Sequence, residues 1–190
     1  MPVTSPGIFG VLYPNLLSVG LLGSDTPKLA RGIANGLTRW VPQIRVSTTD
    51  AGSAGSGTNI PLSVVVANPI LLANLISGMS SQGLLGVFVP PYLVGLTNGL
   101  VSAFLQMLIK TTHTGVGTGA GIAKFTAPPA RTSMINGFFS AGLRGEYAVR
   151  KASAIAQGLD LTFGSLLLPV SIVGSASPYP ATGVGSGSVV

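Results

Sequence analysis

The sequence predicts a mainly α protein of three imperfect helix-turn-helix repeats, with short β segments and glycine-rich connections. One pattern occurs three times in the same register, and each copy runs without a gap. A recurring unit of this length is one supersecondary element that buries its apolar face against its neighbours. We therefore expect one domain over residues 1–190, with repeats at about residues 8–59, 71–122 and 132–187. The matched positions are Gly20, Leu21, Gly23, Gly32, Ile33, Asn35, Gly36, Leu37 and Gly52; Gly83, Leu84, Gly86, Gly95, Leu96, Asn98, Gly99, Leu100 and Gly115; and Gly142, Leu143, Gly145, Ala154, Ile155, Gln157, Gly158, Leu159 and Gly174.

Each copy is expected to open with a helix that ends at a glycine turn. Apolar residues recur there at helical spacing and lead up to Gly20, Gly83 or Gly142. Glycine takes the left-handed backbone conformation that commonly ends a helix. The apolar positions of these first helices are Phe9, Leu12, Leu16, Leu17 and Val19; Leu71, Leu72, Leu75 and Met79; and Met134, Phe138 and Phe139.

A second helix is expected after each turn. In the first copy Ser24 or Asp25 suits the N-cap, and Pro27 suits the first turn, where its missing N–H is harmless. Pro90 holds the place of Pro27 in the second copy and Val149 holds it in the third. Six leucines of the turns and second helices are predicted to be core residues: Leu21, Leu84, Leu143, Leu37, Leu100 and Leu159.

The second helices share a step of two small residues four positions apart. Glycine inside a helix costs roughly 1 kcal/mol relative to alanine. Its recurrence at one register predicts compensation through close backbone approach by another helix. A neighbouring amide side chain could then donate a hydrogen bond across the contact, or simply be solvated. The small pairs are Gly32 and Gly36, Gly95 and Gly99, and Ala154 and Gly158; the amides are Asn35, Asn98 and Gln157.

β-Prone segments follow each helix pair, at residues 44–49, 108–112 and 166–173, with 60–66 as an extra strand between the first two copies. Residues 108–112 could instead continue the preceding helix. Glycine-rich stretches come next, at residues 52–57, 115–119 and 183–187. We expect these stretches to be flexible or tightly packed connections.

The chain carries very little charge for a soluble protein. Charged residues make up 7% of it, against about a quarter in a typical domain. Mean hydropathy is +0.61, and no charged residue occurs between Ala51 and Ile109. Low charge and large apolar surfaces promote association. Composition therefore predicts that other subunits, or lipid, cover much of the surface.

No constellation of residues predicts an enzyme, a metal site or a cofactor. The glycine stretches lack the Gly-Lys-Ser/Thr ending of a P-loop, and no Gly-x-Ser-x-Gly elbow occurs. The only histidine, His113, has no carboxylate near it in sequence, and there is no cysteine. The four acids form no spacing suited to metal binding or acid–base catalysis. They are Asp25, Asp50, Glu146 and Asp160, of which Asp25 and Glu146 are expected at helix N-termini.

Over about residues 8–187, the Gly-Leu-x-Gly turns, the Asn/Gln-Gly-Leu steps and the Gly/Ser/Thr-rich tails resemble small repeat-bearing structural proteins of tailed bacteriophages. The resemblance implies a virion component of the head, neck or tail. Such a component is present in many copies and binds other copies and neighbouring virion proteins. The predicted function is therefore structural, with localisation in the virion and a pseudo-threefold or solenoid-like arrangement of the repeats.

Two other functions remain open from the sequence. A small oligomeric membrane-associated protein is the main alternative, because residues 83–109 form an uncharged stretch long enough to span a bilayer. Charges in the matching parts of the other copies argue against it. Contact with nucleic acid is the weaker alternative, suggested by the net charge of +6. It requires five basic residues to converge on one surface: Arg31, Arg39, Arg144, Arg150 and Lys151.

Overall fold

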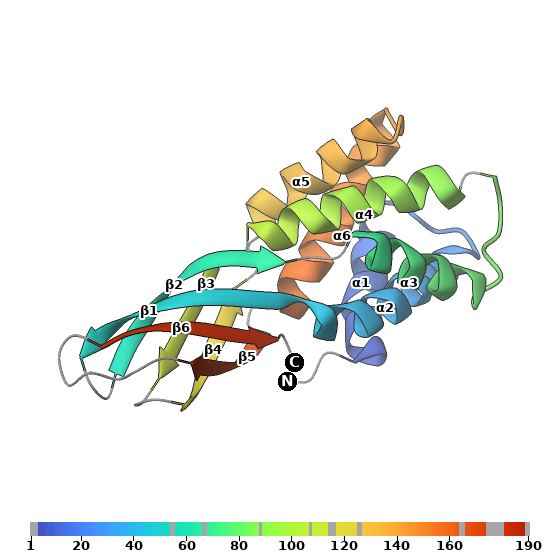
Figure 1. The fold of residues 1–190 in the computed structure, drawn as a ribbon. Helices are drawn as coiled ribbons and strands as arrows, with labels where there is room; N and C mark the ends of the chain where they lie inside the picture. Colours follow the sequence, from blue (N-terminus) through green and yellow to red (C-terminus); the bar gives the residue numbers. More distant parts are fainter. Residues whose placement is uncertain are drawn as a thin grey trace.

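The order of elements in the computed structural model is two helices and then two strands, three times over (Figure 1). The structure describes the backbone of residues 4–53, 56–65, 68–87, 89–106, 108–113, 117–124, 127–163, 166–173 and 181–188, and the side chains of residues 4–44, 69–87, 89–106 and 130–163. The expected mainly α character is confirmed. The elements are α1 (Ser5–Ser18), α2 (Thr26–Trp40), the short 3-10 helix η1 (Val41–Gln43), β1 (Arg45–Ser53), β2 (Ser56–Val65), α3 (Asn68–Ser80), α4 (Val89–Leu105), β3 (Leu108–His113), β4 (Gly117–Lys124), α5 (Ala127–Ser140), α6 (Glu146–Phe163), β5 (Leu166–Val173) and β6 (Ala181–Ser188).

The helices form a closed ring. Each packs against the next along the chain, and α6 returns to pack against α1. The strands leave one end of this ring as an elongated arm, and the helical hairpins turn at the other end (Figure 1). Leu37, Leu100 and Leu159 are fully buried in the ring, as predicted.

The closest helix contacts join neighbouring hairpins and lie at the predicted glycines. A Cβ added to Gly36 would lie 2.8 Å from Leu75 Cδ2 on α3, and one added to Gly99 would lie 2.7 Å from Met134 Cα on α5. A Cβ on Gly158 would lie 3.1 Å from Leu12 Cδ1 on α1. The predicted close approach is thus confirmed, and its partner is the first helix of the following hairpin.

The glycines of the first helices complete two of these contacts. A Cβ on Gly78 would overlap the carbonyl oxygen of Gly32, and one on Gly137 would overlap that of Gly95. The hydrogen bonds predicted for the matched amide side chains differ between the copies. Asn98 donates to Ser140 Oγ at 3.4 Å on α5, whereas Asn35 accepts from Ser5 Oγ at 2.5 Å on α1.

The three hairpin turns begin with one geometry, as the glycine spacing predicts, although the third differs at its second glycine, where Gly145 has a φ of 99° and the matched Gly23 and Gly86 have no positive φ. Gly20, Gly83 and Gly142 have positive φ values of 85°, 73° and 79°. The N–H of the following leucine reaches back to a carbonyl of the first helix, from Leu21 to Leu16 (3.2 Å) and likewise in the other two turns. This pattern is the Schellman motif, in which the residue after the glycine packs back onto the helix.

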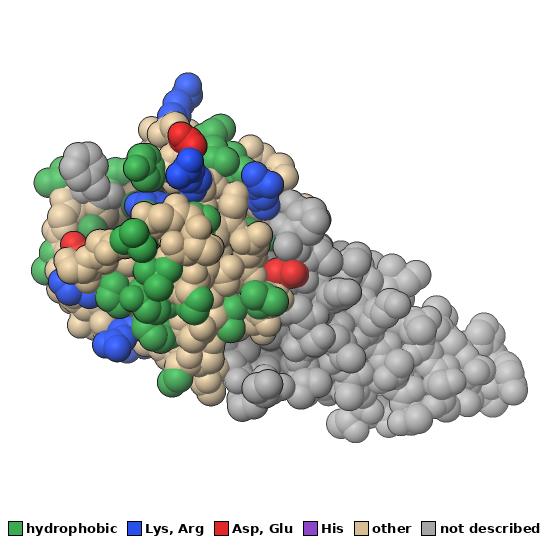
Figure 2. Space-filling view, turned by 180° about the vertical axis from the view of Figure 1, so that it is seen from behind, with side chains coloured by type: hydrophobic (Ala, Val, Ile, Leu, Met, Phe, Trp, Pro, Cys, Tyr) green, Lys and Arg blue, Asp and Glu red, His purple; other side chains and the backbone are tan. Residues whose placement is uncertain are grey.

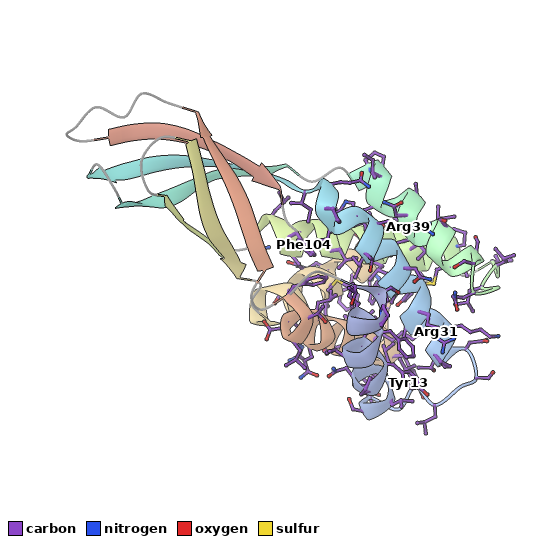
Figure 3. All side chains as sticks on the ribbon, turned by 90° about the horizontal axis from the view of Figure 1, so that it is seen from below. Tyr13, Arg31, Arg39 and Phe104 are labelled. Carbon is purple, nitrogen blue, oxygen red and sulfur yellow. The ribbon has the colours of Figure 1, made fainter. Side chains whose placement is uncertain are left out.

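An aromatic cluster fills the ring at the end nearest the strands. Trp40 and Phe104 meet edge-on at 4.9 Å between ring centroids, and Phe104 meets Phe163 at 5.6 Å. These residues come from the C-terminal ends of α2, α4 and α6, and all are buried. Figure 3 places Phe104 where the helices give way to the strands. Aromatic contacts of this kind add to the stability that burial alone provides.

Within the described residues, the six strands form one closed antiparallel sheet in chain order, with β6 pairing back to β1. An even number of strands allows every pair around the closed sheet to be antiparallel. The glycine-rich stretches were expected to be connections, but all three contribute residues to strands. Gly52 lies within β1 and Gly57 within β2. Gly117 and Gly119 lie within β4, and Gly183 and Gly185 within β6. Residues 108–113 form β3 and do not continue the helix.

The close contacts predict opposite effects for two helical glycines. Gly99→Ala should destabilise the protein by about 1–3 kcal/mol, because the new methyl group collides with backbone that cannot easily move. Gly10→Ala is the control, since nothing lies within 4 Å of its Cβ position and α1 should gain up to about 1 kcal/mol. Urea unfolding measures both changes. Equal stabilisation by the two substitutions would contradict the close packing of α4 and α5.

Candidate functional site

The clearest candidate site is an apolar cavity of about 320 Å³ at the hairpin end of the helical ring. Ligand pockets generally begin at about this size. Its apolar walls come from three helices (α2, α3 and α4) and all three turns, and its polar residues come from α2, α6 and the residue before α2. The lining residues are Leu21, Leu29, Met79, Leu84, Val89, Tyr92 and Leu143, together with Asp25, Thr26 and Lys151.

The three turn leucines meet in this cavity. Leu21, Leu84 and Leu143 were predicted to be core residues, and this is only partly correct, because each is partly buried at the edge of the core. The Schellman geometry explains the difference. It directs the side chain after the glycine back toward its own helix, at the end of the ring and not into its centre. The three leucines therefore form the mouth of a hollow.

A second set of matched positions also lines the cavity. Leu29, Tyr92 and Lys151 each lie three residues before the small residue that opens the helix contact, so they occupy the same place in the three copies. The first copy has a leucine there, while the other two have residues that can donate hydrogen bonds. This set was not predicted from the sequence. Helical spacing places Lys151 on the same side of α6 as the buried Ile155, which is the signal that could have identified it.

The two polar members of this set are unusual in their surroundings. The Lys151 ammonium lies over the Tyr92 ring, 5.4 Å from its centroid. The Tyr92 hydroxyl is shielded from solvent and has no hydrogen-bond partner among the described residues. Burial lowers the pKa of Lys151 below its usual 10.5. Burial also raises the pKa of Tyr92 well above its usual range. The cavity thus has one cationic side chain, Lys151, in a mainly apolar wall, and the Tyr92 hydroxyl is sealed off from it.

Asp25 lies at the edge of the cavity and is already paired. Its carboxylate contacts Lys28 Nζ at 2.9 Å, and both side chains are exposed. Its position before α2 is as predicted, but its side chain makes no capping hydrogen bond. Glu146 begins α6, as expected, and forms an exposed ion pair with Arg150.

The basic residues do not gather on one surface. Arg31 lies over the Phe9 ring of α1, at 5.1 Å, whereas Arg39 donates to Ser77 of α3, at 2.9 Å. Figure 3 shows the two arginines at separate places along α2. Lys151 lies in the cavity, and Figure 2 shows the blue side chains scattered over the helical part. The convergence required for the nucleic-acid alternative is therefore not found in the described part of the chain.

The remaining candidates form no cluster in the part of the chain whose side chains are described. Among the described residues no group of three His, Cys, Asp or Glu side chains could hold a metal ion. His113 and Asp50 belong to strands whose side chains lie outside the described set. No helix in the described ranges is long and apolar enough to cross a membrane. Residues 83–109 are divided between the turn, the 17-residue α4 and the start of β3.

Large apolar side chains are exposed close in sequence to residues that line the cavity. Leu22 is 79% exposed, Leu85 is 74% exposed and Val87 is 87% exposed. Leu22 and Leu85 hold the same place in two turns, directly after the cavity leucines, and Arg144 holds that place in the third. Green side chains gather on this helical part in Figure 2.

No protein-family model, curated protein or solved structure matches this chain.

Lys151 should leave a signature in the dependence of stability on pH. The unfolded chain keeps the lysine proton up to about pH 10.4, whereas the folded chain releases it at lower pH. Between these two pKa values the free energy of unfolding should therefore rise with pH. Above about pH 10 it should fall, because the unfolded Tyr92 ionises and the folded one does not.

Urea unfolding across pH 8–11 measures this profile. Lys151→Met should abolish the rise below pH 10. Arg150→Met is the matched control. It removes an exposed cation one residue before Lys151 on α6 and should leave the rise in unfolding free energy intact. Identical profiles for the wild type and Lys151→Met would contradict the assignment.

Proposed function

We propose that this chain is a structural subunit of a multi-subunit assembly, a virion component that binds other copies of itself and neighbouring virion proteins. The observation that carries the proposal is the exposed apolar set at the hairpin end, Leu22, Leu85 and Val87. Burying a side chain of this size contributes about 1.5–3 kcal/mol. A set of three at one end of the molecule therefore suits a contact between subunits.

We also infer that the chain consists of three copies of one unit with two helices and two strands, related by a pseudo-threefold arrangement. Support comes from the recurrence of equivalent contacts: Gly36 meets Leu75, Gly99 meets Met134, and Gly158 meets Leu12. These three contacts join matched positions of consecutive units. The packing of α6 on α1 favours a closed arrangement over a solenoid, whose terminal units would have no such contact.

The low charge of the chain supports the same function. Only 7% of residues are charged, so few like charges would oppose the packing of many copies. The exposed apolar set is also the feature that a membrane-associated protein would use. Recovery of the protein with and without detergent distinguishes the two functions. The proposal assigns no catalytic reaction to the chain.

Substitution of the exposed turn leucines should weaken self-association. We expect the wild-type chain, expressed without detergent, to form a defined oligomer by light scattering and sedimentation velocity. Leu22→Ser with Leu85→Ser should weaken that association on the order of 100-fold, because two apolar side chains per contact are lost.

The double variant Leu105→Ser with Leu161→Ser is the matched control. Both side chains are exposed, by 52% and 70%, and both lie near the C-terminal ends of their helices, away from the turns. It should assemble like the wild type. A wild-type chain that stays monomeric at all concentrations would contradict the proposal. Recovery only in detergent would favour the membrane-associated function.

A further inference from the structure

The second hairpin of the ring differs from the other two in charge. Residues 68–106, which include α3, α4 and the turn between them, contain no charged residue. The first and third hairpins both carry charges, and in each of them basic residues outnumber acidic ones. Their charged residues are Asp25, Lys28, Arg31 and Arg39 in the first hairpin, and Arg131, Arg144, Glu146, Arg150, Lys151 and Asp160 in the third. One sector of the ring is therefore free of charge.

The uncharged sector also exposes apolar side chains beside a groove. Ile76 on α3 is 48% exposed, and Val94 on α4 is 40% exposed. The two helices pack on each other less extensively than the helices of the other two hairpins do. A groove of about 170 Å³ lies between them, with Ile76 and Ser80 on one side and Pro90 and Leu93 on the other. The outer face of the second hairpin is thus both apolar and hollowed.

A face without charge suits a contact with the same face of a second copy. In a twofold contact both subunits present the same patch, so any charge in the patch is brought toward its own counterpart. Like charges placed opposite each other are strongly unfavourable in an interface. The first and third hairpins, with their surplus of basic residues, would oppose such a contact. The second hairpin has no charge that could repel its own copy.

The composition of α3 and α4 favours a protein partner over a lipid surface. Helices that lie on a membrane generally combine an apolar face with Lys and Arg residues that attract anionic lipids. Neither α3 nor α4 contains a basic residue. The exposed side chains beside the groove are aliphatic and lack the Trp residues that are common at membrane interfaces.

We propose that two copies of this chain associate through their second hairpins about a twofold axis, so that exposed apolar side chains of each copy cover the α3–α4 groove of the other. This inference rests on the proposed function, because it names the partner at the apolar contact proposed there. Leu85 and Val87 of that contact belong to the second hairpin. Leu22 belongs to the first turn, whose Leu21 meets Leu84 of the second turn in the cavity.

Two double variants of opposite charge test the twofold contact. Ile76→Lys with Val94→Lys, and Ile76→Glu with Val94→Glu, each place like charges on both sides of it. Each variant alone should weaken self-association at least about 100-fold at low ionic strength. An equimolar mixture should recover most of the lost affinity, because lysines of one copy then face glutamates of the other. Sedimentation velocity measures the three samples, and circular dichroism checks that each variant is folded.

The double variant Phe139→Lys with Leu161→Lys is the matched control. It adds two positive charges at exposed apolar positions of the third hairpin, where the side chains are 41% and 70% exposed. It should associate as the wild type does.

Cross-linking through single cysteines gives a second test, which adds no charge and decides the matter if the charged variants fail to fold. Ser18, Ser81 and Ser140 hold the same place at the ends of the first helices of the three hairpins, and all three are exposed. Each Ser→Cys substitution introduces the only thiol in the chain. With a short bismaleimide, Ser81→Cys should give cross-linked dimers, whereas Ser18→Cys and Ser140→Cys should remain uncrosslinked.

The possible failures can be told apart. A wild type that associates, together with charged variants that associate equally well or equal cross-linking of all three thiols, would overturn the second hairpin as the contact and leave the assembly function standing. Folded variants that do not associate, alone or mixed, would overturn the twofold arrangement. A wild type that stays monomeric and does not bind lipid would contradict the proposed function itself. A wild type that stays monomeric but floats with phosphatidylcholine vesicles would assign the face to a lipid surface.

Discussion

Helical backbones approach each other in this protein at places where there is no room for a side chain. Gly36 against Leu75 and Gly99 against Met134 bring neighbouring hairpins together, and Gly158 against Leu12 joins the last helix to the first. Glycine costs a helix stability, so these positions weaken each helix in isolation. Close packing along the ring offsets that cost. The helices therefore depend on their neighbours in the adjacent hairpins, and the ring forms as a whole.

The ring has two different ends. Trp40, Phe104 and Phe163 fill the end nearest the strands. At the other end, the Schellman turns place leucines around a hollow and leave it open. One matched position of the sequence pattern lines this hollow, and the chain has three different residues there: Leu29, Tyr92 and Lys151. These three different residues make the hollow chemically uneven around its wall.

The helices, their turns and their close contacts could be predicted from the sequence, because each has a local signal. Gly20 and Gly83 take the left-handed conformation expected of them, and the small-residue steps lie at helix contacts as expected. The cavity could not be predicted, because it depends on how three distant turns meet. The closure of the sheet likewise depends on long-range pairing. From the sequence Lys151 was considered only as one of the basic residues that could contact nucleic acid, although its helical spacing relative to Ile155 indicates an inward position.

Formation of a disulfide between α1 and α6 would test the closed ring most directly. The chain has no cysteine, so Leu12→Cys with Gly158→Cys introduces a single possible pair. A Cβ on Gly158 would lie 3.7 Å from the Leu12 Cβ, which is within the range of a disulfide. Mild oxidation should give a rapid link within one chain, detected by peptide mass. The pair Leu12→Cys with Leu161→Cys should form no such link, because Leu161 is exposed. Failure of the first pair, or equal linkage in both, would contradict the closed ring.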